Sequence, residues 1–159
     1  MRKIGIIVGI LLITMGCATQ QERAEERAKT KMLVQEAIAS KRMHIDVRMM
    51  NTLRYGSKVV TSDFYLELRG DTLRSYLPYM GQAFNASMMT PSVGLNFEER
   101  ILQFSERRIK ANKTRLEMDV KTQEDSYHYT IDVYDSGEAT IGVRPVNRDP
   151  ISFEGRVDE

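Results

Sequence analysis

The spacing of hydrophobic residues changes near residue 43 and divides the chain into a helical part and a β-rich part. Residues 20–40 contain no Gly or Pro and are rich in Ala, Glu, Arg, Lys and Gln, which predicts a helix. In residues 20–31 only Ala24 and Ala28 are apolar, whereas the following residues form an apolar stripe of Met32, Leu33, Val34, Ala37 and Ile38. We therefore expect a solvated spacer that continues into a helix docked on a domain.

From Met43 onward, apolar and polar residues alternate with the period of two that is typical of β-strands. Gly70-Asp71 suits a two-residue type II′ hairpin turn, since Gly accepts the positive φ that this turn requires. Folding the chain at this turn places Leu68 opposite Leu73, Glu67 opposite Arg74 and Tyr65 opposite Tyr76. One face of the hairpin is then apolar, and the other carries an ion pair and an aromatic pair.

The C-terminal part predicts a second set of paired strands. A turn at residues 135–137, with Gly137 in the left-handed position, places Ile131 beside Ile141. A last turn at residues 147–150 would bring Phe153 beside Val143 and Val157 beside Ala139. Residues 102–110 fit the pattern less well, because Arg107 would point inward.

These patterns predict an α+β fold. It consists of an N-terminal helix followed by an antiparallel β-meander of about seven to nine strands, arranged as a curved sheet or an open, barrel-like sheet. The apolar face of the sheet must be covered, either by the helical stripe at residues 32–38 or by the sheet curling onto itself. We expect a single domain over residues 32–159.

The N-terminus has the layout of an export signal. Arg2 and Lys3 precede thirteen uncharged residues that end at Gly16, directly before the lone Cys17. This run is too short to span a bilayer comfortably, but it suits a cleaved signal peptide over residues 1–16. Small Gly16 before the cysteine resembles a bacterial lipobox, although Thr14 departs from the usual leucine. The alternative is a plain signal peptide that ends near a cysteine.

We interpret Cys17 as a lipidation site that carries fatty acids such as palmitate and begins the mature protein. Residues 17–31 are then an acylated N-terminus followed by a polar helical spacer. More than one acyl chain on a single residue anchors a protein stably. Ala18 stands where an inner-membrane retention signal would have Asp, so we expect export to the outer membrane, on its periplasmic face.

Composition excludes several classes of protein and site. The 159 residues are 42% hydrophobic and 28% charged, with 23 Lys+Arg against 22 Asp+Glu. This balance argues against a nucleic-acid partner, which would require a basic surface. A single cysteine excludes an intramolecular disulfide and a cysteine-based metal centre.

Residues 78–96 interrupt the strand pattern with a long, apolar loop. Such loops in small domains are often functional, and this one is too apolar to extend freely into water. We regard this loop and the preceding strand end as the candidate binding element, with candidate residues Tyr76, Tyr79, Met80, Phe84, Met88 and Met89. The alternative is a lid that closes one end of the sheet.

Two short motifs carry a resemblance to a known family. The segment Tyr76-Leu77-Pro78-Tyr79-Met80-Gly81-Gln82-Ala83-Phe84, together with the closing Ile151-Ser152-Phe153-Glu154-Gly155-Arg156-Val157, resembles the family called domain of unknown function 4251. The resemblance covers roughly residues 31–158. It implies a small bacterial envelope lipoprotein with a β-rich body, and it implies no activity or catalytic residues.

Motifs for catalysis are absent from the sequence, including a GxSxG nucleophile elbow, a phosphate-binding loop and an HExxH zinc motif. His44 and His128 lie on the polar sides of their predicted strands, so we interpret both as solvated surface residues. The methionines could bind Cu(I), but Met more often fills irregular cores. We therefore predict no catalytic residues, no metal and no cofactor.

Taken together, the sequence predicts an outer-membrane-anchored periplasmic lipoprotein that is a non-enzymatic binding module. Its acyl chains would hold the membrane, and the partner would be an envelope protein or an apolar small ligand. The alternatives are a structural envelope tether, whose function is the anchor itself, and an uncharacterised hydrolase. The sequence leaves the oligomeric state open.

Overall fold

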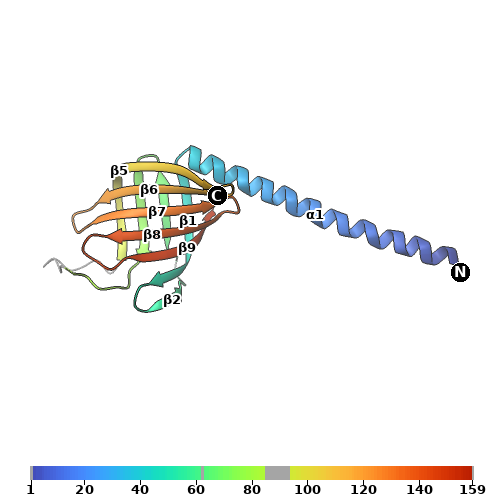
Figure 1. Ribbon diagram of the computed structural model, residues 1–159, viewed down its shortest axis with the longest axis horizontal. Coiled ribbons are helices and arrows are strands. Elements are labelled where there is room, and N and C mark those ends of the chain that lie inside the picture. The colour runs from blue at the N-terminus through green and yellow to red at the C-terminus, as the bar shows by residue number, and fades with distance from the viewer. Residues whose placement is uncertain (1, 62, 85–93, 159) are drawn as a thin grey trace.

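The computed structural model describes residues 2–61, 63–84 and 94–158, with side chains from Gln20 onward. One long helix, α1 (Arg2–Ala39), leads into an antiparallel sheet, and Figure 1 shows the helix extending well beyond it. The strands are β1 (Arg42–Thr52), β2 (Gly56–Val59), β3 (Tyr65–Arg69), β4 (Thr72–Pro78), β5 (Gly94–Lys110), β6 (Lys113–Lys121), β7 (Ser126–Tyr134), β8 (Glu138–Pro145) and β9 (Ile151–Asp158).

The sheet closes on itself. Consecutive strands pair as a meander, and β1 pairs with β3 on one side and with β9 on the other, which makes a barrel of 8 strands with β2 as an extra strand. The predicted helix and antiparallel meander are confirmed. The open arrangement is corrected, because β9 runs antiparallel along almost the whole of β1, from Ile151 opposite Thr52 to Asp158 opposite His44.

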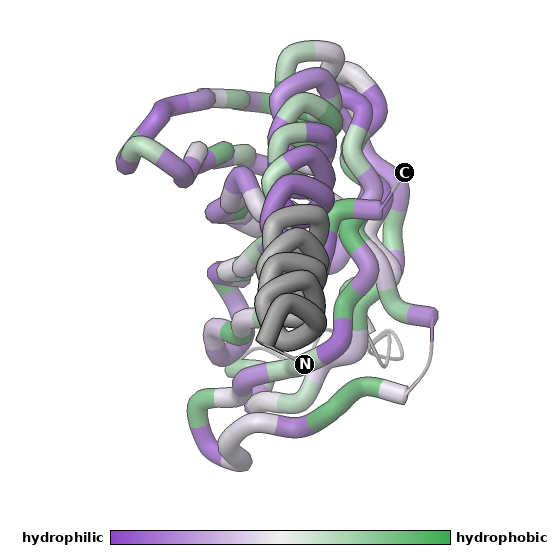
Figure 2. The backbone as a smooth tube through the Cα atoms, turned by 90° about the vertical axis from the view of Figure 1, so that its right-hand side faces the viewer, coloured by the Kyte–Doolittle hydropathy of each residue, from purple (hydrophilic) through white to green (hydrophobic). Residues whose placement is uncertain are grey.

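Side chains fill the barrel interior. Inward and outward residues alternate along strands such as β6 and β7, and hydrophilic and hydrophobic colours alternate along much of the tube in Figure 2. The largest fully buried side chains are Tyr129, Phe153, Ile45, Leu66, Leu68, Leu73, Leu77, Leu95, Leu116, Met118, Ile131 and Ile141. The interior is therefore a packed core, as is usual for a small barrel of this strand number.

The hairpin registers that depend on a glycine turn are confirmed. Leu68 pairs with Leu73 and Tyr65 with Tyr76, and Gly70 has the positive φ of 62° that the turn requires. The two tyrosine rings lie 5.7 Å apart. Glu67 and Arg74 face each other as predicted, but their salt bridges go to Arg69 and to Glu98, respectively.

The register of the last hairpin is corrected by two residues. Phe153 pairs with Ile141 rather than with Val143, and Gly155 takes the predicted place of Val157 opposite Ala139. The reason is that residues 144 and 145 pair with β7 but not with β9, so Val143 pairs with Ile151 and the connection between them spans residues 144–150 rather than 147–150.

Bulges move two side chains from their predicted faces. A register shift between Val47 and Met49 turns Met50 into the core, so that Met49 is only half-buried. A second shift near Ile101 precedes the C-terminal half of the long strand β5, which is mostly solvent-exposed. Arg107 is therefore exposed, although simple alternation would point it inward.

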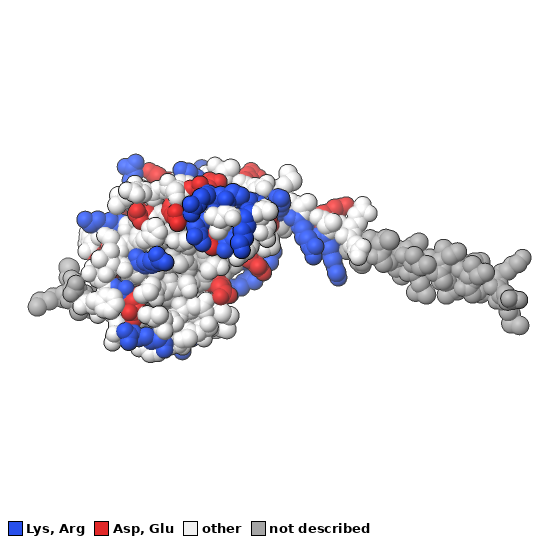
Figure 3. Space-filling model, in the orientation of Figure 1, with Lys and Arg blue, Asp and Glu red and all other residues white. Residues whose placement is uncertain are grey.

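Helix α1 docks on the barrel through a short segment before its C-terminal end. Val34 and Ile38 are buried and Ala37 packs beside them, while Met32 and Leu33 of the predicted stripe remain exposed. Lys31 Nζ lies 3.3 Å from Asp135 Oδ2, which also accepts a hydrogen bond from Arg108 at 2.9 Å. Figure 3 shows Lys and Arg side chains gathered where the helix meets the barrel. Within the part of the helix whose side chains are described, no segment is long and apolar enough to cross a membrane.

The barrel closure generates a prediction at Gly155. A Cβ atom at this position would lie 2.2 Å from the carbonyl oxygen of Asp46 on β1, which is backbone and cannot move aside cheaply. We expect Gly155→Ala to lower the free energy of unfolding by about 1–3 kcal/mol, measured by urea denaturation. The matched control is Gly142→Ala, whose Cβ would be 3.7 Å from the nearest atom, the carbonyl oxygen of Thr130. Equal effects of the two substitutions would contradict this account of the closure.

The helix junction generates a prediction about pH. Hydrogen bonds from Arg108 and then Lys31 hold the pKa of Asp135 below its usual range. A carboxylate with a lowered folded-state pKa stabilises the fold above its unfolded pKa, and this contribution is lost as pH falls through the folded pKa. Asp135→Asn should therefore destabilise the protein at neutral pH, and the difference from the wild type should vanish in strong acid. Asp71→Asn, which removes an exposed ion pair with Arg100, should have little effect at either pH.

Candidate functional site at the distal end of the barrel

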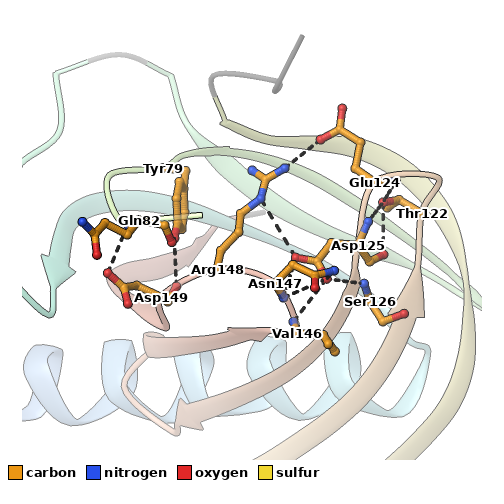
Figure 4. Close-up of polar contacts among 10 residues, drawn as sticks. All are labelled: Tyr79, Gln82, Thr122, Glu124, Asp125, Ser126, Val146, Asn147, Arg148 and Asp149. Carbon is orange, nitrogen blue, oxygen red and sulfur yellow. Dashed lines mark hydrogen bonds and ion pairs between the residues drawn. The ribbon is translucent and has the colours of Figure 1, made fainter. Parts of the chain in front are cut away.

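Three chain segments meet at the end of the barrel that lies opposite helix α1, which we call the distal end (Figure 1). They are the β1–β2 hairpin tip at residues 53–55, the loop that follows β4, and the turn between β8 and β9. Strand direction explains this meeting, because β1, β4 and β8 all run toward the same end in the antiparallel meander. The connection between β6 and β7, residues 122–125, lies there as well (Figure 4).

Asp149 ties the three segments together. Its Oδ2 atom accepts hydrogen bonds from Arg54 Nε at 2.9 Å and from the amide of Gln82 at 3.0 Å. The hydrogen bond from Gln82 and that from Arg54 hold the pKa of Asp149 below its usual range. The Phe84 amide also donates to the Asn147 carbonyl oxygen at 2.7 Å. The loop after β4 is therefore fastened to the barrel at two points.

Tyr79 is an anchor within this arrangement rather than a free binding residue. Its hydroxyl donates to the carbonyl oxygen of Asp149 at 3.1 Å, and the Arg148 guanidinium lies 5.5 Å from the ring centre (Figure 4). Burial raises the pKa of its phenol. Gly81 is needed beside it, because a Cβ there would lie 2.5 Å from the Tyr79 hydroxyl oxygen. Tyr79 is therefore held in place by Asp149 and Arg148.

Asp125 fastens the remaining connection. This fully buried carboxylate accepts hydrogen bonds from the amides of Ser126 at 2.8 Å and of Val146 and Asn147 at 3.2 Å (Figure 4). Arg148 lies 4.0 Å from it and donates to Glu124 at 2.8 Å. Sequence reasoning missed Asp125, Arg148 and Asp149. The available signal was a pair of charged residues, Arg148-Asp149, in a turn that the pattern treated only as a turn.

Apolar side chains remain exposed around this polar network. Leu53 is on the hairpin tip, Met80 and Phe84 are on the loop after β4, and Val146 is in the β8–β9 turn; we call these four residues the distal collar. Phe84 is 60% exposed and Val146 69% exposed. The backbone around these four residues is held in place by the hydrogen bonds described above. Those bonds involve Arg54, Gln82, Phe84 and Asn147.

The other candidate residues lie elsewhere or outside the described residues. Tyr76 is on the outer wall of β4, 43% exposed, with its ring 5.3 Å from that of Phe64. Tyr65 continues this row to His44, whose ring stacks on it at 4.9 Å. Met88 and Met89 lie outside the described residues, as does the side chain of Cys17.

The charged side chains at the distal end and the two histidines of the outer wall are already paired with neighbouring groups. Asp125 and Asp149 at the distal end both accept several hydrogen bonds from the surrounding chain, and those from Gln82 and Arg54 hold the pKa of Asp149 below its usual range. His44 and His128 contact Asp46 at 3.2 Å and Asp119 at 2.7 Å on the outer wall. Within the described residues, no three His, Cys, Asp or Glu side chains are placed to hold a metal ion.

Two open grooves lie near the helix junction. They measure about 720 Å³ and 770 Å³ and share Ser40, Arg42 and Asp158 in their linings. Both grooves lie at the helix end of the barrel, whereas the distal collar lies at the opposite end.

We predict that Asp149 controls the order of the loop after β4. Asp149→Ala removes the acceptor shared by Arg54 and Gln82, so amide hydrogen exchange across residues 79–84 should accelerate while exchange in β6 and β7 stays slow. Asp119→Ala, which removes a half-exposed carboxylate from the outer wall, is the control. A loop that exchanges equally slowly in both variants would show that other contacts hold it.

Comparisons with known proteins agree with the fold. The family model for the domain of unknown function DUF4251 matches residues 24–157. The crystal structure of a DUF4251 family protein from Bacteroides eggerthii is similar with a TM-score of 0.62 at 14% identity, covering 82% of this chain and 87% of that one. A search of curated proteins found no match. Since the family model covers most of the chain, including residues 76–84 and 151–157, the protein belongs to the DUF4251 family.

Proposed function

We propose that the protein is a non-enzymatic binding module that engages an envelope protein partner through the distal collar. The observation that carries this proposal is the exposure of apolar side chains from three chain segments that buried hydrogen bonds hold in place. Ordered apolar groups at a surface are typical of protein interaction sites. A pre-ordered surface also loses little conformational entropy on binding.

A protein partner suits the barrel better than an apolar small ligand does. Small ligands usually bind in concave sites that enclose most of their surface. Here the interior is filled by side chains such as Tyr129 and Phe153, both 0% exposed. A partner that covers the outside of the distal end needs no internal cavity.

The length of the helix supports a binding site that is held away from the membrane. If Cys17 is acylated and begins the mature chain, the helical residues from there to Lys31, where the helix contacts the barrel, would span roughly 20 Å, at 1.5 Å per residue. The distal collar lies at the far end of the barrel from this helix (Figure 1). The proposed location is the periplasmic face of the outer membrane.

The collar proposal predicts a selective loss of binding. Met80→Ser combined with Phe84→Ser should reduce the partner recovered with the full-length protein after in-cell cross-linking by at least about tenfold, because central apolar residues dominate interface energy. Leu102→Ser is the matched control, since Leu102 is 64% exposed on the outer wall of β5. Undiminished recovery with the collar variant would refute the proposal.

The anchor has its own test. Cys17→Ser should abolish labelling of the protein by a palmitate analogue and release it from the membrane fraction, because no other side chain in the sequence offers a thiol. A Cys17→Ser protein that still carried label would contradict the assignment of the lipid site.

A structural tether is the second candidate function, and the long polar helix favours it. Residues 20–29 are all exposed. Removal of residues 22–28 shortens the helix by about two turns and leaves the docking residues Lys31, Val34 and Ile38 in place. A lost cellular phenotype with normal collar-dependent cross-linking would favour the tether.

A further inference from the structure

Strand β2 is the one described strand that lies outside the barrel. It pairs with β1 alone, and all four of its residues are exposed. Strand β3 pairs with the first half of β1 and β2 with the second half, so β2 takes the place beside β1 that β3 vacates. Its other edge faces away from the barrel. Figure 1 shows the β1–β2 hairpin projecting from the wall.

The pairing of β2 with β1 determines which backbone groups face outward. The Val60 amide donates to the Arg48 carbonyl oxygen at 2.9 Å, and the register continues with Lys58 opposite Met50. Hydrogen-bonded pairs alternate along an antiparallel ladder, so the N–H and C=O groups of Ser57 and Val59 point away from β1. No described residue hydrogen bonds to these outward groups.

This edge is held in shape. The Thr52 hydroxyl donates to the Gly56 carbonyl oxygen at 3.0 Å and accepts from the Tyr55 amide at 2.9 Å. Gly56 has a φ of 69°, which suits glycine at the end of the turn. Arg54 fastens the hairpin tip to Asp149. The edge is therefore a preformed template for another strand.

We propose that the occupant is a second copy of this chain, paired antiparallel through β2 about a two-fold axis at Ser57. In this register the two Ser57 residues exchange hydrogen bonds, Lys58 faces Gly56 of the second copy, and Val59 lies beside Tyr55 of the second copy. Val59 is 74% and Tyr55 56% exposed, so the pairing covers apolar surface. A two-fold axis at Lys58 would instead place two ammonium groups opposite each other.

Self-complementarity is what favours a second copy over a foreign strand. In an isologous interface the same patch is used on both copies. Here each copy offers the other the same outward hydrogen-bonding groups and the same apolar side chains. Side chains of a strand stand above and below the sheet, so those of Ser57, Lys58 and Val59 do not lie between the two edges. Met80, Phe84 and Val146 lie on other chain segments than this edge, so substitutions at Met80 and Phe84 separate collar binding from self-pairing.

The experiment is disulfide trapping of the full-length protein in intact cells. Facing residues in a hydrogen-bonded antiparallel pair have Cα atoms about 5.5 Å apart, which a disulfide can span. Ser57→Cys should give a covalent dimer under mild oxidation. Thr140→Cys, on the exposed outer wall of β8, and the unmodified chain should give none.

A proline variant separates pairing from mere proximity. Val59→Pro in the Ser57→Cys background removes an outward N–H without touching the bonds to β1, so the yield of dimer should fall about tenfold for the loss of the bonds that this group makes in the two copies. An unchanged melting temperature of the variant shows that the fold is intact. Ser57→Cys that cross-links no better than Thr140→Cys, or that joins a different protein instead, would overturn the proposal. Met80→Ser with Phe84→Ser should leave the dimer yield unchanged.

Discussion

The antiparallel pairing of β1 with β9 is the contact on which the rest of the structure depends. It joins residues 42–52 to residues 151–158 and converts a meander into a barrel. Without it, both outer strands would be long open edges, and the apolar faces of Ile45 and Phe153 would lose their cover. The closeness of the two backbones requires Gly155, where no Cβ fits against Asp46. Among the described strands, β2 and the second half of β5 are then paired on one side only.

Charged groups then close the two ends in different ways. At the distal end, Asp125 and Asp149 each accept several hydrogen bonds, so burial of their charge is compensated and three connections are held together. At the helix end, Asp135 joins Lys31 of the helix to Arg108 of the wall. The first network leaves apolar side chains exposed on an ordered rim, and the second fixes the direction in which the helix leaves the barrel. Together they support a domain presented at a distance from its proposed anchor.

The structure explains why particular residues occur in the two motifs that resemble the family. In the segment 76–84, Leu77 enters the core, Tyr79 and Gln82 bond to Asp149, and Gly81 makes room for the Tyr79 hydroxyl. In the segment 151–157, Ile151 and Phe153 are core residues and Gly155 permits the closure. Residues of the first motif therefore cover the distal end of the barrel, and residues of the second allow β9 to pair with β1. The binding residues predicted within the first motif divide into one anchor, Tyr79, and the exposed Met80 and Phe84.

The sequence by itself determined the features that depend on neighbouring residues: the helix, the strands, and the hairpins at Gly70 and Gly137, because periodicity and turn chemistry act over a few residues. Only the tertiary structure decided the β1–β9 closure, the bulge that buries Met50, and the two-residue shift of the last hairpin. Each of these features arises from contacts between segments that are far apart in the sequence. The free energy of such contacts cannot be inferred from the pattern of neighbouring residues. The same holds for Asp149, whose role exists only where Arg54 and Gln82 arrive beside it.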